Sequence, residues 1–136
     1  MLTDRGLFAA LDARAELPVH VDADPATRRA RFPEDVEGAA FFFASEAMAN
    51  ALKHAEATRV DVRLQVAGET LVVEVEDDGA GFVPVDHAGS GLANMRDRVE
   101  ALGGRLPIAS SPGAGTRVRA ELPTSLEAAR AARSDR

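Results

Sequence analysis

The sequence predicts a two-layer α+β sandwich, in which hairpins form one sheet and helices are segregated to one face of it. Two observations lead to this prediction. Two segments read as pairs of strands joined by glycine-containing turns, and three segments carry apolar residues at helical spacing. The predicted order is helix, strand, helix, hairpin, helix, hairpin, with neither an internal repeat nor a second domain.

The N-terminal part is predicted as a helix followed by a short strand. Residues 2–15 indicate a short amphipathic helix because four apolar residues recur at helical spacing: Leu7, Phe8, Leu11 and Ala15. Residues 18–22 are predicted as a brief strand. Asp24 and Pro25 are predicted to begin a turn.

A long, unusually apolar helix is predicted from Pro33 to about Ala55. Proline fits the first helical turn, and the helix dipole favours the two acids that follow it. Because residues four apart share one face of a helix, the polar residues of this segment line up: Glu46, Asn50 and His54, with Lys53 beside them.

In the second half of the chain, glycines mark the predicted turns and the predicted end of a helix. Residues 58–66 alternate apolar and polar side chains, and a tight turn at 67–69 returns the chain as an antiparallel strand over 70–76. A further helix is predicted over 92–102, and the pair of glycines at 103–104 ends it.

Residues 105–110 and 116–122 form the second predicted strand pair. Pro107 cannot donate a backbone hydrogen bond, so the first of these strands is predicted to be an edge strand or to contain a bulge. An Ala/Arg-rich tail follows Pro123 and is predicted to fray.

Composition excludes several classes of protein. The chain has 136 residues, a formal net charge of -6 and no cysteine, which argues against a nucleic-acid binder and against a thiolate metal site. No segment is predicted to span a membrane. The single lysine, Lys53, lies outside any glycine-rich loop, so neither a P-loop nor a eukaryotic-type kinase site can be built.

Glu46 and Asn50 suit a metal-bound phosphate ligand. Mg²⁺ accepts one or two protein oxygens together with substrate phosphates, and the amide oxygen of Asn50 can supply one. Glu46 could accept a proton or orient a nucleophile, and Lys53 could meet phosphate as a point charge. A solvent-facing polar stripe is the alternative, although polar residues within an apolar helix favour a binding role.

Asp77 precedes two glycines, Gly79 and Gly81, which allow close approach of a flat ligand. An ionised carboxylate only accepts hydrogen bonds, so Asp77 suits the exocyclic amino group of adenine. A glycine-rich hairpin turn without a ligand is the alternative; an EF-hand loop is excluded because its twelfth position is Val85. The glycines of the segment 89–91 open the next helix, whose free N–H groups could bind phosphate.

Taken in order, these segments resemble the catalytic, ATP-binding domain of bacterial sensor histidine kinases. FASEAMANALKHA (residues 43–55) is similar to the N box of this family, DDGAGF (77–82) to its G1 box and GSGL (89–92) to its G2 box. GLANMRDRVEALGG (91–104) resembles the subfamily typified by nitrate/nitrite sensors. GAGT (113–116) is similar to a strand-entry motif whose threonine, here Thr116, helps to hold adenine.

The resemblance implies a Bergerat ATP-binding fold, with a mixed, mostly antiparallel sheet backed by three helices. It implies ATP and Mg²⁺ as cofactors, with Glu46 assisting phosphoryl transfer and Asn50 binding the metal. Asp77 would bind adenine. The other implied nucleotide-binding residues are Lys53, His54, Gly79, Gly81, Phe82, Gly89, Ser90, Gly91, Leu92 and Thr116. Only residues 83–88 separate the G1 and G2 boxes, so the predicted lid is short.

The resemblance also implies an organisation. Residues 1–16 would be a junction helix from a missing dimerisation domain, 17–123 the catalytic domain, and 124–136 a flexible tail. The γ-phosphoryl group of ATP would pass to a histidine on that separate dimerisation domain, with a response regulator downstream. The expected location is cytoplasmic, either as a separate protein or as the cytoplasmic part of a membrane-anchored kinase. Two alternatives stay open, namely an anti-sigma-type protein-serine kinase and a non-catalytic nucleotide-gated interaction module.

Overall fold

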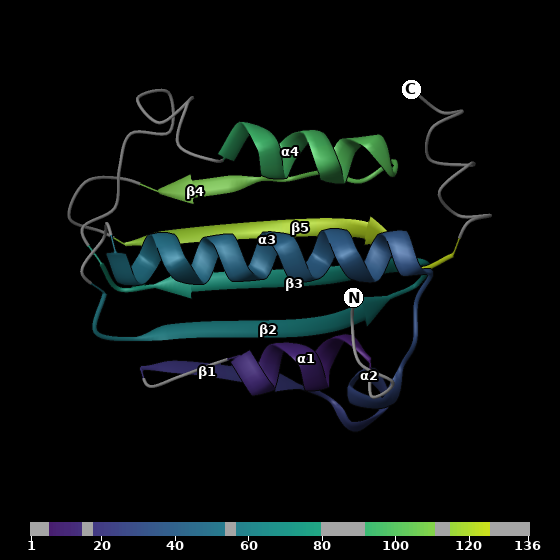
Figure 1. Ribbon diagram of the computed structural model, residues 1–136, viewed down its shortest axis with the longest axis horizontal. Helices are drawn as coiled ribbons and strands as arrows, with labels where there is room; N and C mark the ends of the chain where they lie inside the picture. The colour runs from purple at the N-terminus through teal and green to yellow at the C-terminus, as the bar shows by residue number, and fades with distance from the viewer. Residues whose placement is uncertain (1–5, 15–17, 54–56, 80–91, 111–114, 126–136) are drawn as a thin grey trace.

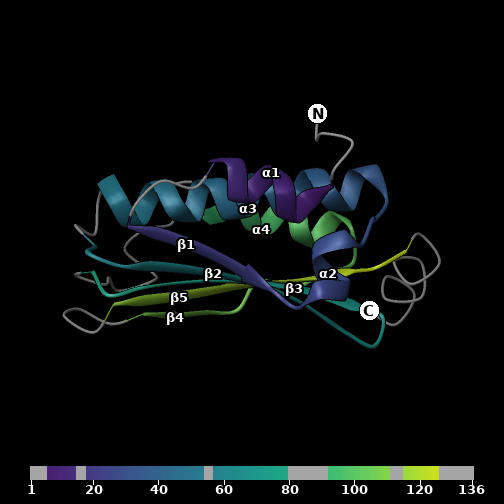
Figure 2. The ribbon, with the colours of Figure 1, turned by 90° about the horizontal axis from the view of Figure 1, so that it is seen from below.

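A computed structural model describes residues 6–14, 18–53, 57–79, 92–110 and 115–125. The fold is the predicted two-layer α+β sandwich, with one sheet beneath a layer of helices (Figures 1 and 2). Within the described residues, five strands follow the spatial order β1-β2-β3-β5-β4, and their bounds are β1 (Val19–Ala23), β2 (Val60–Ala67), β3 (Thr70–Asp77), β4 (Ile108–Ser110) and β5 (Thr116–Pro123).

The sheet is mixed and mostly antiparallel, as the family resemblance implies. β1 runs parallel to β2, whereas β2, β3, β5 and β4 are joined by antiparallel pairings. The predicted hairpin between β2 and β3 is confirmed, with Ala67 opposite Thr70 across a two-residue loop. Gly68 has φ +62 in this loop, a conformation that tight hairpin turns require and that glycine adopts without strain.

Pro107 immediately precedes the edge strand β4, and no bulge forms at it. Arg105 pairs with Glu121 and Ile108 pairs with Val118, so the register continues unchanged through the proline. The Pro107 carbonyl accepts a hydrogen bond of 3.0 Å from Arg119 N. Pro107 has no N–H group, so it donates no hydrogen bond to β5. The missing N–H of Pro107 explains why β4 begins only after it, at Ile108.

Three helices cover one face of the sheet (Figure 2): α1 (Leu7–Arg14), α3 (Glu34–Lys53) and α4 (Leu92–Ala101). A fourth, α2 (Pro25–Arg29), begins where a turn is predicted. Its N-cap is Asp24, whose carboxylate accepts a hydrogen bond of 3.2 Å from Thr27 N, and Pro25 occupies the first turn. Aspartate and proline start turns and helices alike, so the sequence prediction missed this helix.

The core lies between α3 and the central strands. The buried side of α3 is rich in small residues, which lets the helix approach the valines of β2 and β3 closely, and its largest member is Phe43, with 0% exposure. Leu7 and Leu11 of α1 belong to the same core. Helix α1, which lies within the predicted junction at residues 1–16, therefore packs into the domain. The junction itself stays a prediction.

The C-terminus of α4 is closed by the predicted glycine pair. Gly103 has φ +85, its N–H donates to Glu100 O at 3.0 Å, and Gly104 N–H donates to Val99 O at 2.9 Å. This is a Schellman motif, which satisfies carbonyls at the end of the helix. A Cβ on Gly104 would lie 2.2 Å from Glu121 O, so the helix can approach β5 here only without a side chain. None of the helices in the described part of the chain combines the length and apolarity needed to cross a bilayer.

Candidate functional site

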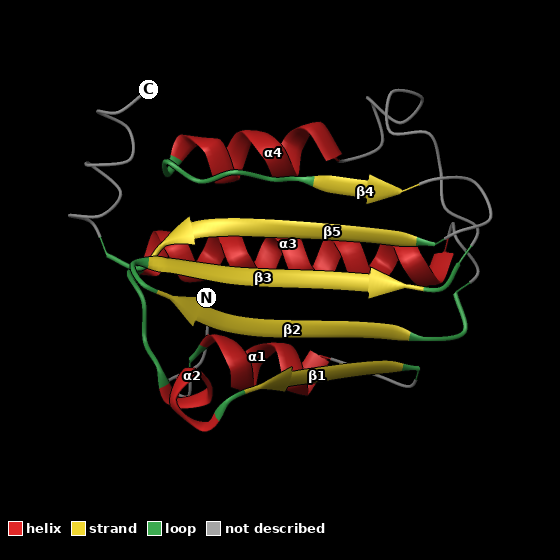
Figure 3. Ribbon diagram, turned by 180° about the vertical axis from the view of Figure 1, so that it is seen from behind, coloured by secondary structure: helices red, strands yellow, loops and turns green. Residues whose placement is uncertain are grey.

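The predicted site residues belong to elements that meet at one end of the sandwich. The C-terminal ends of α3 and β3, the first residues of β2 and β5, and the N-terminal end of α4 lie together at this end (Figures 1 and 3). The strand register shows the same arrangement, because Asp77 pairs with Val60 on one side and with Thr116 on the other.

Asp77 ends β3 with a half-buried side chain. Its Oδ1 accepts a hydrogen bond of 2.8 Å from Gly79 N, in the turn that follows the strand. Burial raises the pKa of Asp77 above its usual value, and the neighbouring acids Asp78 and Glu76 raise it further. Backbone hydrogen bonds from Gly79 and Thr116 oppose this increase in the pKa. The result is a fixed, partly desolvated acceptor.

Gly115 allows β5 to begin directly beside Asp77. It has φ +78, and a Cβ at this position would lie 2.3 Å from the backbone oxygen of Asp77. No other residue type fits that approach without movement of the backbone. Thr116, with 8% exposure, is held next to Asp77 as a consequence. Gly115 lies within the strand-entry motif at 113–116 but is not among the site residues predicted from the sequence.

Glu46 and Asn50 lie one turn apart on the flank of α3 that faces α4. Both side chains are half-buried. One turn earlier, the ring of Phe42 lies under the guanidinium of Arg98 of α4, 4.2 Å from the ring centroid, which identifies this flank. Within the described part of the protein, neither Glu46 nor Asn50 has a side-chain hydrogen bond or ion pair. Two polar groups thus lie on the border of an apolar core without a side-chain partner among the described residues.

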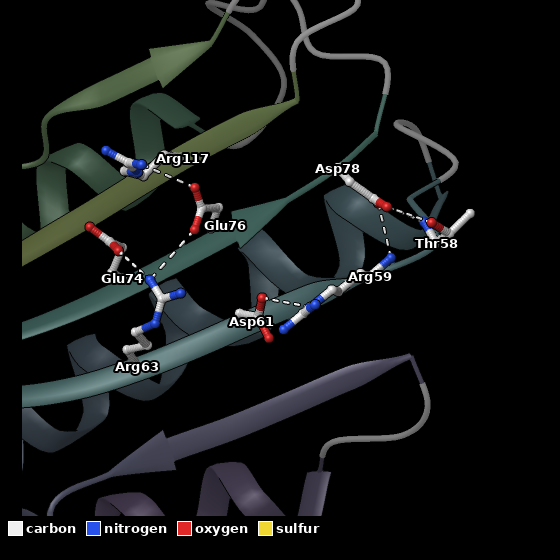
Figure 4. Close-up of polar contacts among 8 residues, drawn as sticks. All are labelled: Thr58, Arg59, Asp61, Arg63, Glu74, Glu76, Asp78 and Arg117. Carbon is white, nitrogen blue, oxygen red and sulfur yellow. Dashed lines mark hydrogen bonds and ion pairs between the residues drawn. The ribbon is translucent and has the colours of Figure 1, made fainter.

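Asp78 connects two loops at this end of the molecule (Figure 4). Its Oδ1 accepts hydrogen bonds from Thr58 N at 2.8 Å and Arg59 N at 2.9 Å, and its Oδ2 accepts one from the Thr58 hydroxyl. These hydrogen bonds hold the pKa of Asp78 below its usual value. The segment it holds leads from α3 into β2. Asp78 and Thr58 are not among the site residues predicted from the sequence.

Several predicted site residues lie outside the described part of the chain: His54, Gly81, Phe82, Gly89, Ser90 and Gly91. Lys53 and Leu92 are placed by their backbone at the end of α3 and the start of α4, respectively. The short lid predicted over 83–88 is outside the described residues as well. Among the described residues, no cluster of three His, Asp or Glu side chains could hold a metal ion.

A groove of about 920 Å³ lies elsewhere, over the N-terminal part of α3. Its walls include Arg14 of α1, Phe41 and Phe42 of α3, and Leu102 after α4. Glu46, Asn50 and Asp77 do not line it, so this groove is separate from the end of the sandwich where the predicted site residues gather.

Comparison with known proteins identifies the family. Residues 39–126 match the family described as "Histidine kinase-, DNA gyrase B-, and HSP90-like ATPase". This match covers more than half of the chain, and the chain belongs to that family. It is therefore an ATP-binding domain, and the match includes the elements that carry Glu46, Asn50, Asp77 and Thr116.

Individual relatives agree with this result. The chain is 34% identical over 111 residues to the signal transduction histidine-protein kinase/phosphatase DegS of Brevibacillus brevis, covering 80% of this chain and 29% of that protein. It is 32% identical over 119 residues to the sensor protein VraS of Staphylococcus saprophyticus, covering 86% and 34%, respectively. The chain spans about a third of the length of these curated relatives.

A solved structure has the same fold. The histidine kinase domain of the Erythrobacter litoralis EL346 blue-light activated histidine kinase is similar, with a TM-score of 0.67 and 30% sequence identity. The similarity covers 86% of this chain and 55% of that one. The mixed sheet backed by helices on one face is thus the fold of a histidine kinase ATP-binding domain, as the resemblance implies.

Proposed function

We propose that this chain is the catalytic domain of a sensor histidine kinase, which transfers the γ-phosphoryl group of Mg-ATP to a histidine on a separate dimerisation domain. One observation carries the proposal. The end of the sandwich where Asp77 is fixed as a desolvated acceptor is also the end toward which α3 presents Glu46 and Asn50 without partners among the described residues. The names of the matched relatives favour a histidine kinase over an anti-sigma-type serine kinase.

Adenine would be recognised at the junction of β3 and β5. The Asp77 carboxylate would accept a hydrogen bond from the exocyclic amino group of the base. Gly79 fixes that carboxylate through its N–H, and Thr116 lies beside it across the register. The absence of a side chain at Gly115 leaves the backbone close enough to form one wall.

The triphosphate and its metal would lie along the flank of α3 that carries Glu46 and Asn50. Asn50 would supply an amide oxygen to Mg²⁺, which takes its remaining ligands from phosphate and water. Lys53, one turn further, would approach phosphate from the end of the helix. Glu46 would orient the acceptor histidine or accept its proton during transfer. The remaining nucleotide contacts would come from His54, from Gly81 and Phe82, and from the segment 89–92.

The acceptor histidine and the downstream response regulator would belong to other domains or proteins. Phosphoryl transfer depends mainly on positioning and charge neutralisation, so this domain needs only to present ATP correctly to the acceptor. We expect the isolated chain to bind Mg-ATP but to form no stable phosphoprotein.

Calorimetric titration with Mg-ATP, Mg-ADP and Mg-GTP tests the binding step directly, and calorimetry suits a chain without Trp or Tyr. Incubation with radiolabelled ATP and a dimerisation domain from a histidine kinase relative tests the transfer step. Slow phosphorylation in trans is expected, because tethering normally supplies much of the effective concentration. Equal affinity for adenine and guanine nucleotides would exclude the role of Asp77, and acid-labile phosphate on His20, His54 or His87 would contradict transfer to a separate domain.

A further inference from the structure

We propose that Asp78, acting with Thr58, is a positioning residue that fixes the adenine-binding aspartate relative to the metal-binding helix. This inference rests on the proposed function and goes beyond it, because Asp78 and Thr58 would touch neither nucleotide nor metal. Their proposed action is to hold together the two chain segments that carry Asp77 and Asn50.

The contacts form a closed connection between α3 and β3. The segment after α3 is tied back to the helix by a hydrogen bond of 3.1 Å from Ala57 N to Ala51 O. Asp78 then accepts three hydrogen bonds from the next two residues, Thr58 and Arg59. In the reverse direction, Asp78 N donates to Arg59 O at 3.3 Å, which extends the β2–β3 pairing by one step.

Two adjacent aspartates therefore have divided roles. Asp77 has the same strand parity as the core residues Val73 and Val75, so it faces the helix layer, and its Oδ1 accepts a hydrogen bond from Gly79 N. Both carboxylate oxygens of Asp78 instead accept hydrogen bonds from the loop before β2 (Figure 4). Alternation along an extended chain makes this division possible, since neighbouring side chains point to opposite faces. Because Asp77 and Asp78 are adjacent in the chain, a shift of Asp78 relative to Thr58 would also move Asp77.

The strength of this connection comes from its donors. Two of the three are backbone N–H groups, which hold their direction well, and an ionised acceptor makes such bonds stronger than neutral ones. A carboxylate that only stabilised a surface loop would affect folding stability but not the preference for adenine over guanine. A carboxylate that positions Asp77 must also affect the discrimination between adenine and guanine. This difference separates the two roles.

The experiment compares Mg-ATP and Mg-GTP affinities of the 136-residue chain with those of its Asp78→Ala, Asp78→Asn and Thr58→Val variants, alongside melting temperatures without nucleotide. In Asp78→Ala we expect ATP affinity and the ATP/GTP preference each to fall by roughly tenfold, as displaced recognition groups do. Asp78→Asn keeps an acceptor for the backbone donors and should recover part of the preference. Thr58→Val removes only the hydroxyl and should give an intermediate loss.

Asp61→Ala and Asp61→Asn are the matched controls. Asp61 also lies next to this loop and accepts a hydrogen bond from Arg59 Nε at 3.0 Å, so each control removes one nearby negative charge without touching the Asp78 contacts. Both controls should keep the base preference of the unmodified chain. If Asp78→Ala does not fold, the Asp78→Asn and Thr58→Val values decide the question alone.

An unchanged ATP/GTP preference in every Asp78 and Thr58 variant that folds, even with a lowered melting temperature, would overturn the positioning role. An unmodified chain that binds no adenine nucleotide would instead refute the proposed function, so the two failures are distinguishable.

Discussion

Glu37 and Glu46 lie on the same helix, α3, and both are at least partly removed from solvent, but their surroundings differ. Glu37 is 3% exposed and accepts hydrogen bonds from Arg31 Nε at 3.1 Å, Arg31 Nη2 at 3.2 Å and Phe32 N at 3.1 Å. Glu46 is half-buried and has no side-chain partner among the described residues. A fully buried carboxylate requires internal partners, whereas a half-buried one can keep water or exchange it for a ligand.

The comparison separates a structural end of α3 from a functional end. At the N-terminal end, the buried Glu37 is satisfied within the protein and holds the segment that leads into the helix. At the C-terminal end, Glu46 and Asn50 remain unsatisfied by described residues, while Asp77 nearby is desolvated and its pKa is raised. Polar groups that a protein leaves without partners at one place are candidates for function. The substitutions below test this difference.

The largest effect is expected from Asn50→Ala. The variant removes the only proposed protein ligand of Mg²⁺, so both Mg-ATP binding and phosphoryl transfer should be lost. Folding stability should change little, because the side chain has no partner to lose within the described protein. Calorimetry and thermal unfolding of the same preparation measure the two quantities. Normal Mg-ATP affinity in this variant would remove Asn50 from the site.

Glu46→Gln should separate chemistry from binding. Glutamine keeps the size and polarity of the side chain but cannot accept a proton, so transfer to an acceptor histidine should slow by roughly 10²–10⁴-fold. Nucleotide affinity should stay within a few-fold of the unmodified chain. If affinity is lost as completely as in Asn50→Ala, the two residues form one binding unit and the proposed division of roles is wrong.

Glu37→Ala should give the opposite result. Loss of its hydrogen bonds to Arg31 and Phe32 should lower the free energy of unfolding by about 2–3 kcal/mol, measured by denaturant titration. Mg-ATP affinity should be unchanged under conditions where the variant is folded. Glu34→Ala is the matched control on the same helix, since Glu34 is exposed and its removal should cost about 0.3–1 kcal/mol through the helix dipole. Equal losses of unfolding free energy in the two variants would show that the buried hydrogen bonds of Glu37 do not contribute to stability.

The contributions of Asp77 and Asp78 to folding stability should change with pH in opposite directions. The raised pKa of Asp77 means that the folded protein favours its protonated form, so its ionisation lowers stability as pH rises from the usual aspartate range to the raised pKa. The lowered pKa of Asp78 gives stability that is present above the usual range and is lost as pH falls through the lowered pKa. Nucleotide affinity should decline on acidification at a higher pH than an ordinary aspartate titrates. Calorimetry across this pH range measures where nucleotide affinity declines. Asp77→Asn should abolish this pH dependence of the affinity.

Much of this fold could be predicted because local signals decide it. Alternation at 58–66 set the faces of β2, and Gly103 with Gly104 marked the end of α4 through a conformation that glycine favours. Asp77 could be selected because a strand end before glycines is itself a local pattern. The nitrate-sensor subfamily, the domain boundaries and the roles of the site residues stay predictions.

The features that sequence reasoning missed depend on contacts distant along the chain. The hydrogen bonds between Asp78 and Thr58 join residues 20 positions apart, and no local pattern marks such a pair. The choice between edge strand and bulge at Pro107 required its register with Arg119. The parallel pairing of β1 with β2 likewise joins strands separated by two helices, and turn chemistry carries no information about it.

The smallest effect is expected from Glu74→Ala, on the sheet face opposite the helices. Glu74 accepts a hydrogen bond of 3.0 Å from Arg63, and Arg63 also reaches Glu76 at 3.5 Å, while Arg117 binds Glu76 at 3.0 Å (Figure 4). Since Arg63 keeps a second acid and is itself exposed, the loss should be below about 1 kcal/mol, as for surface ion pairs in general. Mg-ATP affinity and transfer should be unchanged. A lowered ATP affinity in Glu74→Ala would mean that an ion pair on the sheet face opposite the helices also serves the nucleotide site. Distance from the C-terminal end of α3 would then no longer distinguish structural from functional acids in this domain.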